Sequence, residues 1–322
     1  MKALMRVVAV VAAIGSTLWI SGCAPTISGA TKDDTTVTGT SKELAKTTSD
    51  VEEYQGPKLR VGVVNFQNKT PSKVLGIGEA AADILGTILQ KTGRFIVIPQ
   101  QDIESIAQQQ HLGATGMINP DTAAKMGEVL GLNAIVTGAV TAYSEAEEGQ
   151  DYLVYKKKKQ IARVTVDYRI VDTTTGVQLM ADSGAGIYEK SVGTALGMGG
   201  KSSYDPDLRD GALRDALTKA MVNMMKQLGK RKWSGRIASA KGSQVYINAG
   251  QKSGIQVGDK LLVYRPGDAI IDPVTRVKIG TEENFIGEIT VLQNDLGDAG
   301  DLSRAQGGGQ FKTGDIVKLK GK

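Results

Sequence analysis

The chain of 322 residues contains one cysteine, Cys23, and one histidine, His111. A single residue of each type excludes a disulfide framework, a zinc site built from Cys and His, and any catalytic unit that needs two of either residue. His111 follows three glutamines at the end of a predicted helix, where a surface or helix-end position is the default expectation. Cys23 is therefore the residue whose chemistry has to be explained.

Cys23 directly follows a segment typical of an export signal. A short basic region precedes residues 7–20, which are apolar but too few to span a bilayer stably. Residues 18–23 read LWISGC and resemble the bacterial lipobox, whose cysteine receives diacylglycerol and becomes the new N-terminus. We predict a signal peptide over residues 1–22 and a lipid on Cys23. The alternative is an ordinary signal peptide followed by a free thiol.

Acyl chains on Cys23 would hold the protein to a membrane without a spanning helix, because each buried methylene contributes about 0.8 kcal/mol. Ala24 stands where an aspartate is the usual inner-membrane retention signal in enteric-type bacteria, so we predict the periplasmic face of the outer membrane. Residues 23–57 are polar, with almost no apolar periodicity, and cannot bury enough surface to offset their ordering entropy. We predict that they form a flexible tether.

From Lys58 the pattern alternates between strands and helices. Residues 59–66 predict a buried strand, and residues 76–91 predict a helix because Ala80, Ile84, Leu85, Ile88 and Leu89 recur at helical spacing. Further elements are predicted over residues 94–98 (strand), 101–110 (helix), 119–130 (helix), 133–143 (strand) and 206–228 (helix). This order predicts an α+β domain over residues 58–230, with helices on a mixed sheet.

A different sequence pattern begins near Trp233. Short apolar runs broken by glycine predict strands, and they lie at residues 235–237, 244–248, 260–264, 285–292 and 315–319. Gly258-Asp259 and Gly314-Asp315 stand just before two of these runs, where glycine can supply a positive φ. We predict that residues 233–322 form a second, small β domain.

Four segments of the first domain read KLRVGVVNFQNKT, TGRFIVIPQQDIESI, LGLNAIVTGAVTAY and VTVDYRIVDTTTGVQLMADSGAGIYEKSVG, and they occur in this order over residues 58–230. Together they resemble the CsgG/HfaB family, the outer-membrane lipoproteins named for curli production assembly and transport. The resemblance implies a ring of subunits, each giving two extended hairpins to a shared β-barrel through which unfolded curli subunits leave the cell.

The sequence departs from the family at the pore. The family's constriction loop carries Tyr, Asn and Phe, whereas residues 68–75 (NKTPSKVL) are a shorter loop without this set, so no constriction residue is carried over. The resemblance places the hairpins between Tyr143 and Val164 and between Gln178 and Tyr204. Residues 144–160 are highly charged and lack the alternation of a lipid-facing strand, whereas residues 182–203 are Gly-rich and could form a short hairpin. We therefore predict an oligomer that gives no stable, large conductance.

The second domain resembles the C-terminal domain of the flagellar assembly protein FlgT. The similarity rests on the glycine-bounded strands, on residues 271–275 (IDPVT) and on the run around Gly287. It implies an SH3-like β-barrel that serves as an interaction module and has no chemistry of its own.

Several motifs imitate ligand sites. Residues 195–202 (ALGMGGKS) nearly match a phosphate-binding loop, but the first glycine is replaced and the next helix starts too late, so a flexible loop is the simpler interpretation. Residues 76–81 have a GxGxxA pattern, which we interpret as a helix start packed on the sheet. Lys156 to Lys159 could face anionic headgroups or form a solvated hairpin tip. The acid pairs at residues 147–148 and 282–283 are interpreted as solubilising.

The formal net charge is +5, and removal of the signal peptide takes away Lys2 and Arg6 and no acid, which leaves +3. This charge is too small to indicate nucleic acid as a partner. The sequence predicts a non-enzymatic, lipid-anchored protein without cofactor or metal, acting as a homo-oligomer in assembly or export of a surface structure. The alternative is a periplasmic adaptor without a pore that supports a flagellar basal body or peptidoglycan synthesis. A nucleotide-dependent enzyme is a more distant possibility.

Overall fold

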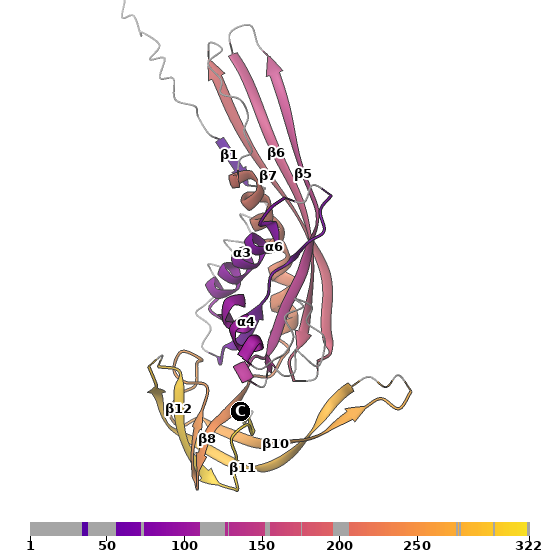
Figure 1. The fold of residues 1–322 in the computed structure, drawn as a ribbon. Coiled ribbons are helices and arrows are strands. Elements are labelled where there is room, and N and C mark those ends of the chain that lie inside the picture. The colour runs from indigo at the N-terminus through magenta and orange to yellow at the C-terminus, as the bar shows by residue number, and fades with distance from the viewer. Residues whose placement is uncertain are drawn as a thin grey trace, which may run out of the picture. The chain divides into compact units, whose positions relative to one another are not determined.

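The computed structural model describes residues 34–37, 56–71, 74–109, 126–127, 129–151, 155–174, 176–195, 206–274, 276, 278–298 and 300–320. Residues 33–322 form one compact unit. Within the described residues, a mixed sheet with helices is followed by a closed barrel of antiparallel strands (Figure 1). The α+β class expected from the sequence is confirmed.

The mixed sheet is built around three strands of equal length. Its order is β1 (Asp34–Val37), β7 (Gln178–Ala195), β6 (Tyr155–Asp172), β5 (Ala134–Asp151), β2 (Leu59–Val63) and β4 (Phe95–Ile98), and β3 (Gln67–Asn68) pairs with β5. Strands β2, β3 and β4 join by parallel pairing, and β1, β5, β6 and β7 pair antiparallel. Parallel pairing needs crossover connections, which the helices of this half supply.

Helices cover both faces of the inner half of the sheet. Helices α3 (Ile77–Lys91) and α6 (Pro206–Leu228) pack against each other and share a core with Ala134 and Val136 of β5. Helix α4 (Gln100–Gln109) buries Ile103 with Ile135, in a separate cluster. Because successive residues of a strand point to opposite faces, α4 lies on the face opposite α3 and α6.

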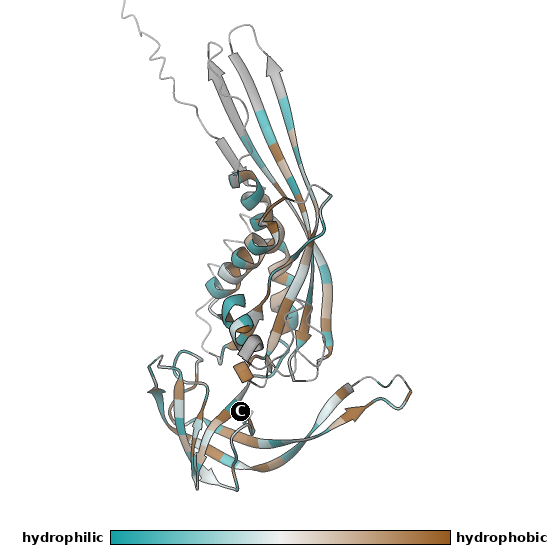
Figure 2. Ribbon diagram, in the orientation of Figure 1, coloured by the Kyte–Doolittle hydropathy of each residue, from teal (hydrophilic) through white to brown (hydrophobic). Residues whose placement is uncertain are grey.

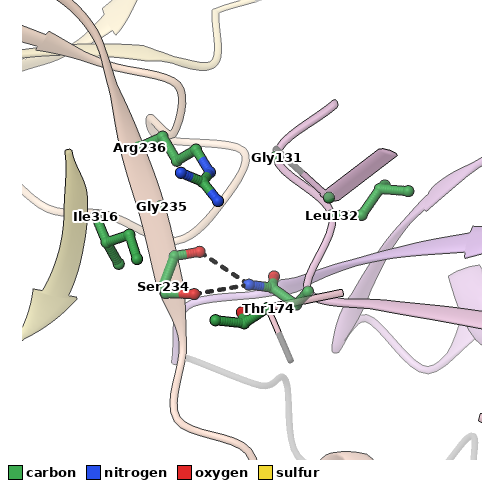
Figure 3. Close-up of a pocket in the computed structure, with 9 residues that line it drawn as sticks. Gly131, Leu132, Thr174, Ser234, Gly235, Arg236 and Ile316 are labelled. Atoms are coloured by element: carbon green, nitrogen blue, oxygen red, sulfur yellow. Dashed lines mark hydrogen bonds between the residues drawn. The ribbon is translucent and has the colours of Figure 1, made fainter. Parts of the chain in front are cut away.

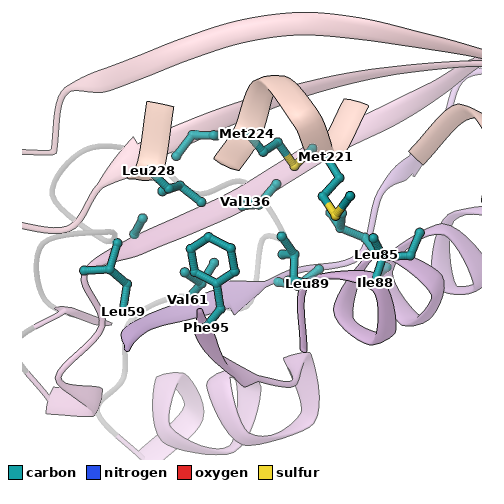
Figure 4. Packing of buried hydrophobic residues seen from close by; sticks show 14 of the residues in the cluster. Leu59, Val61, Leu85, Ile88, Leu89, Phe95, Val136, Met221, Met224 and Leu228 are labelled. Carbon is teal, nitrogen blue, oxygen red and sulfur yellow. The ribbon is translucent and has the colours of Figure 1, made fainter. Parts of the chain in front are cut away.

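The core between α3, α6 and the sheet follows the predicted helical spacing. Ile84, Leu85, Ile88 and Leu89 of α3 are buried as expected, whereas Ala80 is only partly buried. Figure 4 shows side chains of α3 and α6 meeting those of β2, β4 and β5. Met221 and Met224 of α6 are buried in the same cluster, where their flexible, unbranched side chains can fill irregular space.

Six strands close the barrel. They are β8 (Ser234–Lys241), β9 (Gln244–Ile247), β10 (Lys260–Ile271), β11 (Lys278–Leu296), β12 (Leu302–Gly308) and β13 (Ile316–Leu319), paired in the order β10, β11, β12, β9, β8, β13. Alternate residues such as Val245, Ile247, Leu261 and Val263 point inward and are fully buried. Gly258 and Gly314 have φ of 93° and 91° just before β10 and β13, as the Gly-Asp pairs predict.

Three features differ from the sequence-based expectation. Residues 34–37 lie inside the predicted tether but form strand β1, because backbone pairing with β7 needs no apolar side chain. Strand β5 continues from the expected end near residue 143 to Asp151, through the charged segment, and Figure 2 shows hydrophilic residues there on β5 and β6. The Gly-rich residues 182–195 are part of β7 and not of a separate hairpin. Residues 196–205 lie outside the described range.

The change from helix to barrel falls where the sequence predicts it, with α6 ending at Leu228 and β8 beginning at Ser234. One continuous apolar cluster nevertheless includes core residues of both parts, Leu59 and Leu228 from the first and Trp233 and Ile237 from the second. Independent folding of residues 233–322, and the domain boundaries in general, stay predictions.

Candidate interaction surfaces

Helix α6 is fixed on β7 by small residues. A Cβ atom at Gly186 would lie 2.1 Å from the carbonyl oxygen of Ala212, and one at Gly184 would lie 2.6 Å from that of Ala216. On the helix, Gly211 leaves room for the ring of Tyr188, which a Cβ atom would approach to 2.4 Å. The glycines of β7 thus allow close contact between helix and strand.

A buried carboxylate adds a polar contact to the same interface. Asp215 of α6 is almost fully buried, accepts a hydrogen bond from the backbone N–H of Ile187 at 2.9 Å and pairs with Lys219 at 2.6 Å. A buried carboxylate without such partners would be costly, so these contacts fix the position of α6 along β7. Sequence reasoning did not identify Asp215 or the role of the glycines, since both depend on which helix meets which strand.

The outer ends of β5, β6 and β7 extend beyond the helices (Figure 1). There β1 pairs with one edge of the sheet, from Asp34 opposite Ser191 to Val37 opposite Tyr188. On the other side, β5 pairs with β2 and β3 only as far as Val140, so within the described residues its outer part has β6 as its sole strand neighbour. Among the described residues, the outer part of β5 therefore pairs with a strand on one side only, whereas β1 covers the edge of β7.

The outer part of the sheet carries charged residues of both signs on neighbouring strands. Lys156 to Lys159 belong to β6 and lie opposite residues 148–151 of β5, so that Lys159 faces Glu148 and Lys156 faces Asp151 in the register. Lys159 also pairs with Glu189 of β7 at 2.9 Å. The lysine run is thus part of a three-stranded sheet, close to the end of the β5–β6 hairpin, and Lys159 has an acidic residue on each neighbouring strand.

The joint between the sheet and the barrel is held by Asn133. Its Oδ1 accepts a hydrogen bond from the N–H of Arg60 at 2.8 Å. Its Nδ2 donates to the carbonyl oxygen and hydroxyl of Ser234 at 2.9 and 3.1 Å, which are the dashed lines in Figure 3. The pocket beside it has a volume of about 10 Å³, enough for about one water. This is a structural joint, too small to bind a ligand.

Two arginines strengthen the joint. Arg231 contacts the fully buried carboxylate of Asp172, which also accepts a hydrogen bond from the N–H of Thr174 at 2.7 Å. Arg60 of β2 lies 3.5 Å from Asp301, in the loop before β12. Burial lowers the pKa of both guanidinium groups. Two larger, open clefts of about 730 and 480 Å³ flank the joint.

The barrel carries a second exposed feature, the distal half of the β10–β11 hairpin. Its apolar residues Val274, Ile279 and Phe285 are 87%, 55% and 60% exposed. The ring of Phe285 packs edge-on against Tyr264, with 5.7 Å between centroids. The sequence motif at residues 271–275 falls at the tip of this hairpin.

The residues and motifs singled out in the sequence are of three kinds: those outside the described residues, the glycine motif at residues 76–81, and the acid pairs. Cys23 and His111 lie outside the described residues, as do the signal peptide over residues 1–22 and most of the phosphate-loop look-alike. Gly76 caps α3 with φ of 69°, and a Cβ atom at Gly78 would lie 1.8 Å from the carbonyl oxygen of Phe66, as expected for a helix start packed on the sheet. Of the acidic pairs, Glu283 contacts Lys318 and Glu147 is exposed.

No group of three or more potential metal-ligating side chains occurs among the described residues. Within the same part of the chain, none of the helices combines the length and the apolar character needed to cross a membrane.

The comparison with protein families gives a clear match. The model of the family described as "Curli production assembly/transport component CsgG" covers residues 43–257, more than half of the chain. The chain therefore belongs to the CsgG family. The match extends past the expected range of residues 58–230 at both ends and includes β8 and β9 of the barrel.

Two of the proteins that the chain resembles are described as lipoproteins. The putative lipoprotein NMB1126/NMB1164 of Neisseria meningitidis serogroup B is 29% identical over 204 residues, which make up 60% of this chain and 86% of the relative. Among solved structures, lipoprotein GNA1162 from Neisseria meningitidis is 18% identical, with a TM-score of 0.32. The match covers 52% of this chain and 98% of the GNA1162 chain. The LpoB C-terminal domain from Escherichia coli is 14% identical with a TM-score of 0.31, covering 45% and 93%.

These TM-scores are too low to support further comparison of the structures. Family membership and the lipoprotein relative indicate a lipoprotein of the bacterial envelope. The resemblance of residues 233–322 to FlgT stays a prediction.

Proposed function

We propose that this protein is an outer-membrane lipoprotein, anchored through Cys23 on the periplasmic side, that acts in assembly or export of a cell-surface structure such as curli-type fibres. Membership of the CsgG family is the observation that carries the proposal. The role requires no catalytic step, cofactor or metal. Its partners are further copies of the chain and the proteins of a surface-fibre or envelope assembly system.

The position of β1 supports this anchoring geometry. Asp34 follows Cys23 by eleven residues, and a fully extended chain of this length spans at most about 40 Å. Since β1 pairs with β7 near the outer end of the sheet, a lipid on Cys23 would keep that end within this distance of the membrane. The described sheet is thus attached by a much shorter tether than residues 23–57 suggest.

Strand pairing on one side only, which holds for the outer part of β5 among the described residues, supports self-association. An unpaired strand edge offers its N–H and C=O groups to a strand of another chain. We propose that copies of this protein associate through the α+β part. The barrel, as an SH3-like interaction module, would stay available for other proteins.

Replacing Cys23 with Ser tests the anchor. The variant should lose labelling by radioactive palmitate and should move from the membrane to the soluble periplasmic fraction. Ser21→Ala, which leaves a small residue before the cysteine, is the matched control and should keep the label. Continued labelling of Cys23→Ser would contradict the proposal.

The charged outer half of β5 and β6 favours a second candidate function, a non-pore periplasmic adaptor that supports a flagellar basal body or peptidoglycan synthesis. Gene deletion separates the two. Loss of secreted fibre subunits with normal motility and wall synthesis supports the first function. A defect in motility or wall synthesis, with normal secretion, supports the adaptor.

A further inference from the structure

Strand β4 is the end strand of the mixed sheet. It pairs in parallel with β2, from Leu59 opposite Phe95 to Gly62 opposite Ile98, and the N–H of Leu59 donates to the carbonyl oxygen of Arg94. In this register residues 94, 96 and 98 face β2, so residues 95 and 97 turn their backbone groups outward. Within the described residues no strand pairs with that outer side.

A cleft of about 730 Å³ follows this strand. Phe95, Ile96 and Val97 all line it, although successive side chains of a strand point to opposite faces. The cleft therefore reaches the backbone edge of β4. Its other wall comes from the barrel, including residues 296–298. The volume is in the range of pockets that bind ligands of moderate size.

Arg60 gives the cleft an incompletely compensated positive charge. It lines the cleft and lies opposite Ile96 in the pairing of β2 with β4. Its Nε is buried and has no hydrogen-bond partner among the described residues. Asp301, at 3.5 Å, is shared with Ser253, which donates both its N–H and its hydroxyl to the same carboxylate. The guanidinium group has five N–H donors, and a second carboxylate that reaches its exposed part would add to the contact with Asp301.

Two further cations line the cleft. Lys58 is partly buried and Lys252 is exposed, and neither takes part in an ion pair among the described residues. The one other carboxylate in the lining is Asp298, which is exposed in the loop after β11. With Asp301 occupied by Arg60 and Ser253, the cations exceed the acids that remain.

We propose that this cleft binds an extended acidic peptide segment of a partner protein, which adds to the edge of β4 as a further strand. The outward N–H and C=O groups of residues 95 and 97 would pair with the peptide backbone. An acidic side chain would meet Arg60 and Lys58 on one wall and Lys252 on the other. Addition of a strand to a sheet edge takes its affinity from backbone pairing and its selectivity from such side chains. This inference goes beyond the proposed function and does not depend on the anchor.

Fluorescence anisotropy with the detergent-extracted full-length protein tests the proposal. The probe is a fluorescein-labelled seven-residue peptide of alternating valine and glutamate. A glutamine copy keeps the shape without the charge, and a copy N-methylated at every residue has no backbone N–H left with which to pair as a strand. We expect saturable binding of the first probe and a loss of affinity of about tenfold or more for each copy, which corresponds to about 1.4 kcal/mol. Equal binding of all three probes, or no binding of the first, would overturn the proposal.

Variants of the protein locate the site. Lys252→Glu alters an exposed side chain and should weaken binding of the glutamate probe about tenfold without changing the circular dichroism spectrum. Lys241→Glu, at an exposed lysine of β8 outside the cleft, is the matched control and should bind as wild type. Arg60→Gln should also weaken binding. If Lys252→Glu and Lys241→Glu behave alike, the cleft is not the binding site.

Discussion

At the scale of single residues, the contact between α6 and β7 depends on glycines, which have no side chain to separate the two backbones. Gly184 and Gly186 let the helix backbone approach the strand, and Asp215 then bonds to the N–H of Ile187. A strand rich in glycine is intrinsically weak, so the close packing of α6 has to compensate. The same glycines that suggested a flexible hairpin in the sequence are therefore part of the core.

Replacing Gly186 with Ala should destabilise the protein by about 1 to 3 kcal/mol, as expected for overpacking. The new Cβ atom would lie 2.1 Å from the Ala212 carbonyl oxygen and 2.4 Å from the Ala216 nitrogen, which are helix backbone atoms. Gly280→Ala is the control, since its Cβ atom would meet only Ile270 at 3.8 Å, and its effect should stay within about 0.5 kcal/mol. Urea unfolding measures both. Equal stability of the two variants would contradict the packing argument.

Local patterns were sufficient for residues whose role is local. The positive φ of Gly258 and Gly314 follows from their place before a strand, and the buried face of α3 follows from the spacing of Ile84 and Leu85. The roles of Gly186, Asp215 and Arg60 could not be predicted from the sequence, because each depends on a partner far along the chain. A glycine that contacts a helix has no local signature that distinguishes it from a glycine in a loop.

At the scale of elements, the structure differs most from the expectation in its strands. The sequence predicts α6 from its proline start to Leu228, but it does not indicate β1 or β12, and only the family resemblance places a hairpin where the outer half of β5 lies. Strand β1 and the outer half of β5 pair with a strand on one side only among the described residues, and β12 turns the small residues Ser303 and Ala305 inward. None of the three therefore shows an alternating pattern of large apolar residues, and backbone pairing with a neighbour is enough to define them. Their existence is a property of the sheet and cannot be found in a local window.

Strand β1 should protect the edge of β7 from solvent. Replacing residues 34–37 with a Gly-Ser linker of equal length removes a strand with good β-formers while keeping the length of the tether. The amides of residues 188–191 that face β1 should then exchange with deuterium at least about tenfold faster, because exchange follows local opening. Amides of β6 at residues 164–166, which lie between β5 and β7, serve as the internal control. Unchanged exchange at 188–191 would show that β1 does not cover this edge.

At the scale of the whole molecule, the barrel and the sheet are joined, but the strand pairing of the barrel is internal to it. Every barrel strand has two neighbours within the barrel, so its backbone pairing needs nothing from the sheet. The joint adds hydrogen bonds such as Asn133 to Ser234 and the N–H of Lys58 to the carbonyl of Ser253, and the apolar cluster continues across it. The family match, over residues 43–257, includes β8 and β9 of the barrel together with the sheet.

Residues 233–322 should fold when expressed alone. We expect β-type circular dichroism and a cooperative thermal transition, with a midpoint below that of the full chain because each lost hydrogen bond across the joint removes about 1 kcal/mol. Ser234→Ala in the full chain, which removes the hydroxyl that Asn133 contacts, should move stability in the same direction by a smaller amount. A noncooperative, coil-like isolated fragment would show that the barrel depends on the sheet.

The outer sheet determines whether an oligomer of this protein can conduct ions. Strands β5, β6 and β7 are 18 residues long, which exceeds the length needed to cross a bilayer when tilted. Residues 156–159 of β6 are all lysine, and two of any four consecutive strand residues point to each side. If this part lay near the bilayer midplane, two lysines per subunit would face lipid at about 2 to 4 kcal/mol each. Multiplied over a ring, this cost disfavours a conducting barrel unless the lysines lie at its rim or in its lumen.

We therefore expect the purified protein to form a ring or smaller oligomer through its α+β part but to give no stable, large conductance in planar bilayers. Electron microscopy of the detergent-extracted protein measures the first outcome and single-channel recording the second. The informative variant replaces residues 148–159 with a short turn, since deleting residues 182–203 would remove the β7 contacts that hold α6. Discrete, long-lived channels in wild type that disappear in this variant would show that the outer strands form a pore after all, with the lysines in its lumen or at its rim.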